Sequence, residues 1–188
     1  MTAKEIIKRL KDGNARFTKD KLDGKLQDSS RRKSLTSGQK PFAIVLSCAD
    51  SRVVPELAFD TGLGEIFVVR VAGNVANSSS IASIEYAVAH IGCKAIVVLG
   101  HESCGAVTAA IDGGDNGYNL NHVLSHITPA ISASRKGSSV NSVVKKNAKM
   151  TAKELQNRSA IISGAVDKGK LEVVPAYYNL GSGKVDFL

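Results

Sequence analysis

The chain has 188 residues, 43% of them hydrophobic and 22% charged, a balance typical of one folded domain and not of a disordered or fibrous protein. Three cysteines are too few for a disulfide framework, and no apolar stretch reaches the ~20 residues of a membrane-spanning helix. Most of the formal net charge of +8 lies in residues 1–40, which match no nucleic-acid motif, so we expect neither a nucleic-acid nor a membrane partner.

The N-terminal segment carries apolar residues at near-helical spacing. Ile6, Ile7, Leu10 and Phe17 would lie on one side of a helix, which predicts an amphipathic N-terminal arm. The charged residues at its start do not form the apolar core of a secretory signal peptide, so we expect a cytoplasmic protein. The polar stretch that follows is expected to link this arm to the rest of the chain.

Three short apolar runs rich in β-branched residues, at 41–47, 65–71 and 94–100, predict strands. Because the runs are continuous and not alternating, they are typical of parallel strands buried on both faces. Between the second and third runs, one helical stripe is formed by Ile81, Ile84, Val88 and Ile91. This order of strand, helix and strand indicates a parallel α/β unit.

The second half of the sequence looks helical from about residue 105 to 168, with glycine-rich breaks. Two further apolar runs around a Gly-Ser-Gly turn predict a C-terminal hairpin. We therefore predict an α/β fold, a mostly parallel central β-sheet flanked by helices, with an N-terminal helical arm and a C-terminal hairpin. The whole chain is expected to form one domain, with residues 1–40 as arm and linker and residues 41–188 as the catalytic core.

Two of the cysteines and a histidine directly follow predicted strands. Cys48 comes after the first run, and His101 and Cys104 come after the third. Because ligand sites gather outside the carboxyl ends of parallel strands, these side chains are expected to meet although they are far apart in the sequence. Two thiolates and one imidazole suit zinc, and three protein ligands leave the fourth position open, as in catalytic zinc sites.

A carboxylate and a guanidinium alternate with the first cysteine in the segment CADSR. Arg52 can bind the carboxylate of Asp50 through two hydrogen bonds, and the paired Asp50 can then accept a hydrogen bond from a metal-bound water. A second interpretation stays open, a non-catalytic zinc or redox binding protein in which Cys48 and Cys104 form a reversible disulfide. The Asp50–Arg52 pair argues against it, because a structural site has no need of the pair. Cys93, at the start of an apolar run, is expected to be a small buried hydrophobe.

Four segments carry a strong resemblance to one family. They read CADSRVVPELAF, GEIFVVRVAGN, SIEYAV and VVLGHESCGAV. Together they resemble the β-class carbonic anhydrases, and the similarity runs from about residue 4 to the C-terminus.

The resemblance implies a zinc enzyme that reversibly hydrates carbon dioxide to bicarbonate and a proton by attack of zinc-bound hydroxide. Cys48, His101 and Cys104 would hold the Zn²⁺, and Asp50 and Arg52 would be the catalytic pair. A homodimer or tetramer is also implied. The alternative within the same fold is a hydrolase that acts on carbonyl sulfide or carbon disulfide.

Further residues favour the plant-like, open-site branch of the family. In that branch a glutamine before the first cysteine and two aromatic residues line the substrate pocket, and Gln39, Phe67 and Tyr86 stand at those positions. The bicarbonate-regulated branch has a tryptophan where this chain has Val45, so a regulatory bicarbonate site is not expected. Glu102 departs from many relatives, and we expect it to be a solvated side chain.

Overall fold

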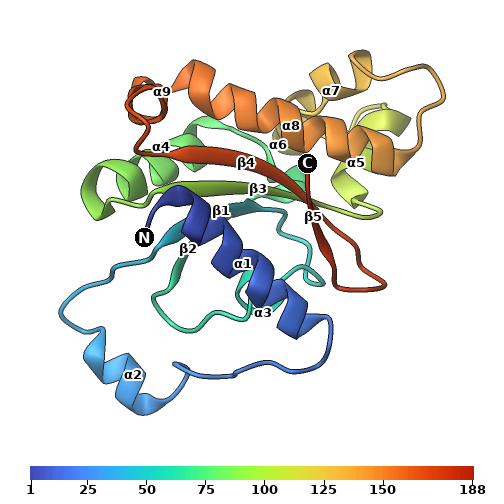
Figure 1. Ribbon diagram of the computed structural model, residues 1–188. Helices are drawn as coiled ribbons and strands as arrows, with labels where there is room; N and C mark the ends of the chain where they lie inside the picture. The colour runs from blue at the N-terminus through green and yellow to red at the C-terminus, as the bar shows by residue number, and fades with distance from the viewer.

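A five-stranded sheet lies at the centre of this computed structural model, which describes residues 1–188 (Figure 1). The strands are β1 (Ala43–Ser47), β2 (Ile66–Arg70), β3 (Ala95–His101), β4 (Glu172–Tyr178) and β5 (Val185–Phe187). Their spatial order is β2-β1-β3-β4-β5; the first four are parallel, and β5 runs antiparallel to β4. The predicted mostly parallel sheet and C-terminal hairpin are thereby confirmed.

Nine α-helices accompany this sheet. They are α1 (Ala3–Phe17), α2 (Ser29–Ser34), α3 (Pro55–Ala58), α4 (Ser78–Tyr86), α5 (Gly105–Asp112), α6 (Tyr118–Ser125), α7 (Thr128–Ser132), α8 (Val140–Arg158) and α9 (Ala160–Asp167). A short 3₁₀ segment, η1 (Ala72–Asn74), precedes α4, and a π-helical turn, η2 (Ala87–Ile91), follows it. Helices α1 and α3 pack on one face, and α4, α8 and α9 pack on the other (Figure 1). None of the helices combines the length and hydropathy needed to cross a membrane.

The predicted N-terminal helix forms and docks on the sheet through its apolar side. Thr2 and Glu5 make reciprocal capping hydrogen bonds that start α1. Leu10 is fully buried against β1 and β3, together with the isoleucines of the same stripe. Asn14, also buried, donates to the carbonyls of Ala58 and Gly183, so α1 is fixed to the end of α3 and to the turn before β5.

How deeply a strand is buried depends on its position in the sheet. All residues of β1 and β3 are buried, as expected for central strands between two helical layers. The expectation that residues 65–71 form a strand buried on both faces is wrong, because β2 is only half-buried. Its position at the sheet edge, with β1 on one side only, leaves its other side open.

The register of the central strands positions the functional loops. Ser47, the last residue of β1, lies opposite Leu99 in β3, so Cys48 follows β1 level with the final residues of β3. Because the strands are parallel, both chain segments leave the sheet at the carboxyl ends of the strands, which form the carboxyl edge of the sheet. The residues between β2 and α4, including η1, return to this edge as well, since Val71 donates its N–H to the carbonyl of Ser47.

Gly13 in α1 provides a test of how closely this helix approaches the core. Alanine normally stabilises a helix interior relative to glycine by about 1 kcal/mol. A Cβ at Gly13 would lie 1.9 Å from the carbonyl oxygen of Phe59, so Gly13→Ala must displace the helix. We expect the free energy of unfolding to fall by about 1–3 kcal/mol in urea titrations. Gly164→Ala in α9 is the matched control, because its Cβ meets nothing within 4 Å and should stabilise. An equal gain from both substitutions would contradict the packing described for α1.

Candidate metal centre

The three predicted metal ligands come together at the carboxyl edge of the sheet. Cys48 follows β1, His101 ends β3, and Cys104 is the residue before α5. Their side chains are 5%, 0% and 1% exposed, and the ligand atoms all lie within 4.8 Å of one another. The two sulfur atoms are 4.0 Å apart. Two Zn–S bonds of ~2.3 Å at a tetrahedral angle would place them about 3.8 Å apart, so the thiols are already spaced for the metal.

The imidazole of His101 is oriented for binding through one nitrogen. Its Nδ1 lies 2.9 Å from the carbonyl oxygen of Glu102, which fixes Nδ1 as the protonated donor. Its Nε2 is buried and has no hydrogen-bond partner. A buried polar atom without a partner is costly, and a metal ion held jointly with the two sulfurs would satisfy it. The residues present therefore fit a tetrahedral metal with one position left open.

The protonation of the two thiols is coupled. The pKa of Cys48 is lowered to about 4, chiefly by the hydrogen bond with Cys104 and further by His101 and the Gly73 N–H. The pKa of Cys104 is raised by the same hydrogen bond and by burial. Burial alone lowers the pKa of His101, but the neighbouring Cys48 thiolate more than offsets this. The pair thus holds one negative charge and one shared proton, which a binding metal displaces.

Asp50 and Arg52 form the predicted ion pair beside the ligands. Arg52 Nε donates to Asp50 Oδ1 at 2.9 Å, and Arg52 Nη2 donates to Oδ2 at 2.7 Å. These hydrogen bonds, together with the Arg52 backbone N–H, hold the pKa of Asp50 well below its usual range. Asp50 Oδ2 lies 3.8 Å from His101 Nε2. An ionised carboxylate therefore stands at the edge of the ligand group.

Two residues that support the ligand loops were not recognised as such in the sequence. Arg70, at the end of β2, donates to the carbonyls of Cys48 and Asp50 at 3.0 and 2.6 Å. The expectation that Glu102 is a solvated side chain is wrong, because its carboxylate accepts the N–H of Leu180 at 3.0 Å. Arg70 carries only the weak signal of lying at the carboxyl end of a predicted strand. No sequence signal points to the role of Glu102, because its hydrogen-bond partner Leu180 is distant in the sequence.

Helix α8 contributes two more polar contacts that the sequence did not suggest. Ser103, between the second and third ligands, has a left-handed backbone with φ 52° and donates its N–H to Asn141 Oδ1 at 2.8 Å. Asn147, further along α8, donates to the carbonyl of Gly73 in η1 at 2.9 Å. Gly73 in turn donates its N–H to the sulfur of Cys48 at 3.3 Å.

The residues predicted to bind substrate are not brought to the ligand group of their own chain. Phe67 lies opposite Ile44 near the amino end of β1, whereas Cys48 follows the carboxyl end. Gln39 precedes β1, which spans about 16 Å at ~3.3 Å per residue, and it is exposed. Tyr86 is 51% exposed at the end of α4. All three lie around or near the open β2 side of the sheet.

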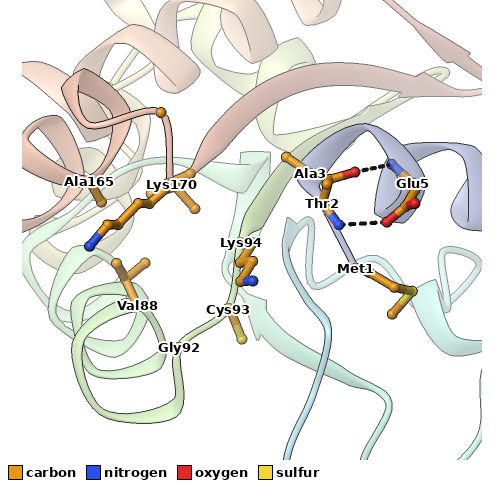
Figure 2. A pocket seen from close by; sticks show the side chains of 12 residues that line it. Met1, Thr2, Ala3, Glu5, Val88, Gly92, Cys93, Lys94, Ala165 and Lys170 are labelled. Carbon is orange, nitrogen blue, oxygen red and sulfur yellow. Dashed lines mark hydrogen bonds between the residues drawn. The ribbon is translucent and has the colours of Figure 1, made fainter.

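A cavity lies away from the metal ligands, at the amino ends of β3 and β4 (Figure 2). It has a volume of about 780 Å³ and is lined by the start of α1 and by residues 88–94 and 165–171, including Lys94 and Lys170. Cys93 also lines it but is buried, and burial raises the pKa of this thiol to about 11. Cys93 is thus the small buried hydrophobe that was expected, and it takes no part in the metal centre.

Comparison with known proteins identifies the family. A family model described as carbonic anhydrase matches residues 43–185. The chain is 41% identical to a carbonic anhydrase of Mycolicibacterium smegmatis over 185 residues, covering 95% of this chain and 90% of that protein. The chain belongs to the β-class carbonic anhydrase family. Carbonic anhydrase 2 of Mycobacterium tuberculosis is 40% identical over 183 residues, covering 94% of this chain and 88% of that protein.

Solved structures agree with this family assignment. A β-carbonic anhydrase of Coccomyxa, in complex with acetazolamide, superposes with a TM-score of 0.78 at 28% identity and covers 86% of this chain and 78% of its own. A tetrameric β-carbonic anhydrase of Sordaria macrospora gives a TM-score of 0.76 at 26% identity, over 84% of this chain and 85% of its own. Enzymes of this class use zinc, which is the metal that the Cys48, His101 and Cys104 donors fit.

Glu102 offers a test of the support around the histidine ligand. Removing its carboxylate in Glu102→Ala leaves the Leu180 N–H without its partner, and we expect the free energy of unfolding to fall by about 1–3 kcal/mol. Glu102→Gln keeps a side-chain acceptor and should lose less than half as much. Thermal or urea unfolding of the zinc-loaded proteins measures both. If the alanine variant is as stable as the parent, Glu102 is solvated as first expected.

Proposed function

We propose that this carbonic anhydrase hydrates carbon dioxide at the Cys48–His101–Cys104 centre, with Asp50 and Arg52 as its catalytic pair. The observation that carries the proposal is the buried, partnerless Nε2 of His101 beside two thiols, with an ionised carboxylate 3.8 Å away. Zinc, when bound there, acts as a Lewis acid that lowers the pKa of a water toward ~7 and so makes a nucleophile available at mild pH.

Asp50 orients the reacting oxygen. Asp50 Oδ1 accepts from both the side-chain Nε and the backbone N–H of Arg52, whereas Oδ2 accepts only from Nη2, so Oδ2 keeps acceptor capacity. Because Asp50 stays ionised, it can only accept a hydrogen bond, and it therefore selects an oxygen that carries a proton. This contact directs the remaining lone pairs of that oxygen toward the carbon of carbon dioxide.

Arg52 also keeps the carboxylate in place. Its two donated hydrogen bonds, with a third from its backbone N–H, hold Asp50 at the rim of the ligand group. The carbonyl of Asp50 is fixed separately by Arg70. Swinging the carboxylate onto the metal would break the bidentate pair, so we assign the chain to the open-site, plant-like branch. Val45, fully buried in β1 where the regulated branch has tryptophan, supports the same assignment.

The substrate pocket is completed by a second copy of the chain. Gln39, Phe67 and Tyr86 lie too far from their own ligands, but they are near the open edge formed by β2. In a two-fold pairing through this edge the two β2 strands run antiparallel. The amino end of one copy then faces the carboxyl end of the other, which places these residues at the partner's metal centre. We infer a homodimer as the minimal active unit, with a tetramer as the larger assembly.

The three free thiols agree with a reducing compartment. An oxidising one would favour a disulfide between Cys48 and Cys104 whenever the metal is lost. We therefore infer a cytoplasmic enzyme whose substrate and product are carbon dioxide and bicarbonate.

Asp50→Ala tests the catalytic assignment. We expect the variant to keep about one zinc per chain but to hydrate carbon dioxide roughly 10²-fold more slowly, because the reacting oxygen is no longer oriented. Stopped-flow hydration and metal analysis on the same samples measure both quantities. Asp12→Ala, which removes a surface ion pair with Lys8, is the control and should retain full activity. If the parent binds zinc and instead hydrolyses carbonyl sulfide or carbon disulfide, the substrate is wrong; if it turns over none of them, it is a binding protein.

Mixed dimers test the shared pocket. One copy carries His101→Ala and cannot hold zinc; the other carries Gln39→Ala with Tyr86→Ala and lacks pocket groups. Each homodimer should be nearly inactive. Random co-assembly should restore about a quarter of the parent rate, because half of the dimers then hold one intact site. Differently tagged copies can be co-expressed and assayed by stopped flow. Pocket residues that served their own chain would give no restoration.

A further inference from the structure

Gly73 is held on both sides, at a position whose backbone conformation favours glycine. Its backbone is left-handed, with φ 71° and ψ 14°, and a Cβ would lie 2.7 Å from Ile127 Cδ1. Its N–H donates to Cys48 Sγ at 3.3 Å, and its carbonyl accepts from Asn147 Nδ2 at 2.9 Å. A rotation of this residue would therefore weaken the contact to the metal ligand and the contact to α8 together.

Asn147 is a buried polar side chain of α8. It is 1% exposed, and its helix buries Val143, Val144 and Ala148 on the same side. A buried amide is costly unless it is hydrogen-bonded, and the carbonyl of Gly73 is its hydrogen-bond acceptor. An apolar side chain could fill the same space, but it would leave that buried carbonyl unpaired. The Asn147 amide therefore holds η1 through its hydrogen bond to the Gly73 carbonyl.

We propose that Asn147 is a positioning residue of the metal centre, acting through Gly73 to aim a backbone N–H at the sulfur of Cys48. An N–H donated to a thiolate fixes the direction of its lone pairs and withdraws charge that the sulfur would otherwise give to the metal. Asn141 on the same helix holds Ser103, between the other two ligands. Helix α8 therefore sets the geometry of both ligand loops. The inference rests on the proposed zinc centre but not on its reaction.

The first measurement is zinc affinity. Asn147→Leu keeps the branched shape of the side chain, with a larger volume and no donor, and it should weaken zinc binding about 10- to 100-fold in competition with a chromophoric chelator. In cobalt-substituted protein the sulfur-to-cobalt charge-transfer absorption should shift as well, because the hydrogen bond to Cys48 is lost. Thr151→Val, one helical turn further on and also buried, changes a residue that makes no hydrogen bond to η1, and it should leave both readouts unchanged.

The outcomes separate positioning from a structural role. If Asn147→Leu only lowers the unfolding temperature and keeps parent-like zinc affinity and cobalt absorption, the proposal is overturned. Asn147→Ala is the second variant, because it avoids overpacking. The proposal is also overturned if both Asn147 variants fail to fold while Thr151→Val folds. The Asn147 amide would then be needed for the stability of the core.

A measurement on the parent protein needs no substitution. With ¹¹³Cd in place of zinc, the Gly73 amide proton should show scalar coupling to cadmium through the hydrogen bond to Cys48. If folded, cadmium-loaded protein shows no such coupling, the hydrogen bond from the Gly73 N–H to the metal-bound Cys48 is contradicted. A parent that binds zinc tightly yet fails to hydrate carbon dioxide would refute the proposed function while leaving this inference intact.

Discussion

The metal centre depends on the pairing of β1 and β3 as adjacent, parallel, fully buried strands. This pairing carries Cys48 and His101 out of the sheet at the same edge, although the whole of β2 and α4 lies between them in the sequence. Burial on both faces fixes the register, because a shift by one residue would turn each apolar side chain toward the wrong helical layer. The spacing of the ligands is thus a consequence of core packing.

Around the ligands, the protein uses hydrogen bonds to hold short loops still. Arg70 binds the carbonyls that flank Ala49, Glu102 binds the turn after β4, and Asn141 binds the loop between His101 and Cys104. Each of these groups comes from a different element. Together these hydrogen bonds restrain the backbone on both sides of the ligands. A three-ligand site with an open position needs this rigidity, since no fourth protein ligand completes it.

The same architecture underlies the proposal that two copies of the chain share a substrate pocket. The ligands occupy the carboxyl edge of the sheet, whereas Gln39 and Phe67 belong to the amino half. The half-buried β2 and the exposed Tyr86 leave an incompletely covered flank next to them. A second copy that covered this flank would bury apolar surface and complete the proposed site. Under this proposal, catalysis requires assembly.

The sequence by itself determined the class of fold, the three ligands and the Asp50–Arg52 pair, because apolar runs report the strands, residue types report donor chemistry, and four segments carry the family resemblance. It misjudged β2 as buried on both faces and Glu102 as solvated. Only the tertiary structure decided the edge position of β2, the support from Arg70, Asn141 and Asn147, and the distance of Gln39 from the ligands. These features join residues far apart in the chain, and a hydrogen bond between distant partners leaves no periodic trace in the sequence.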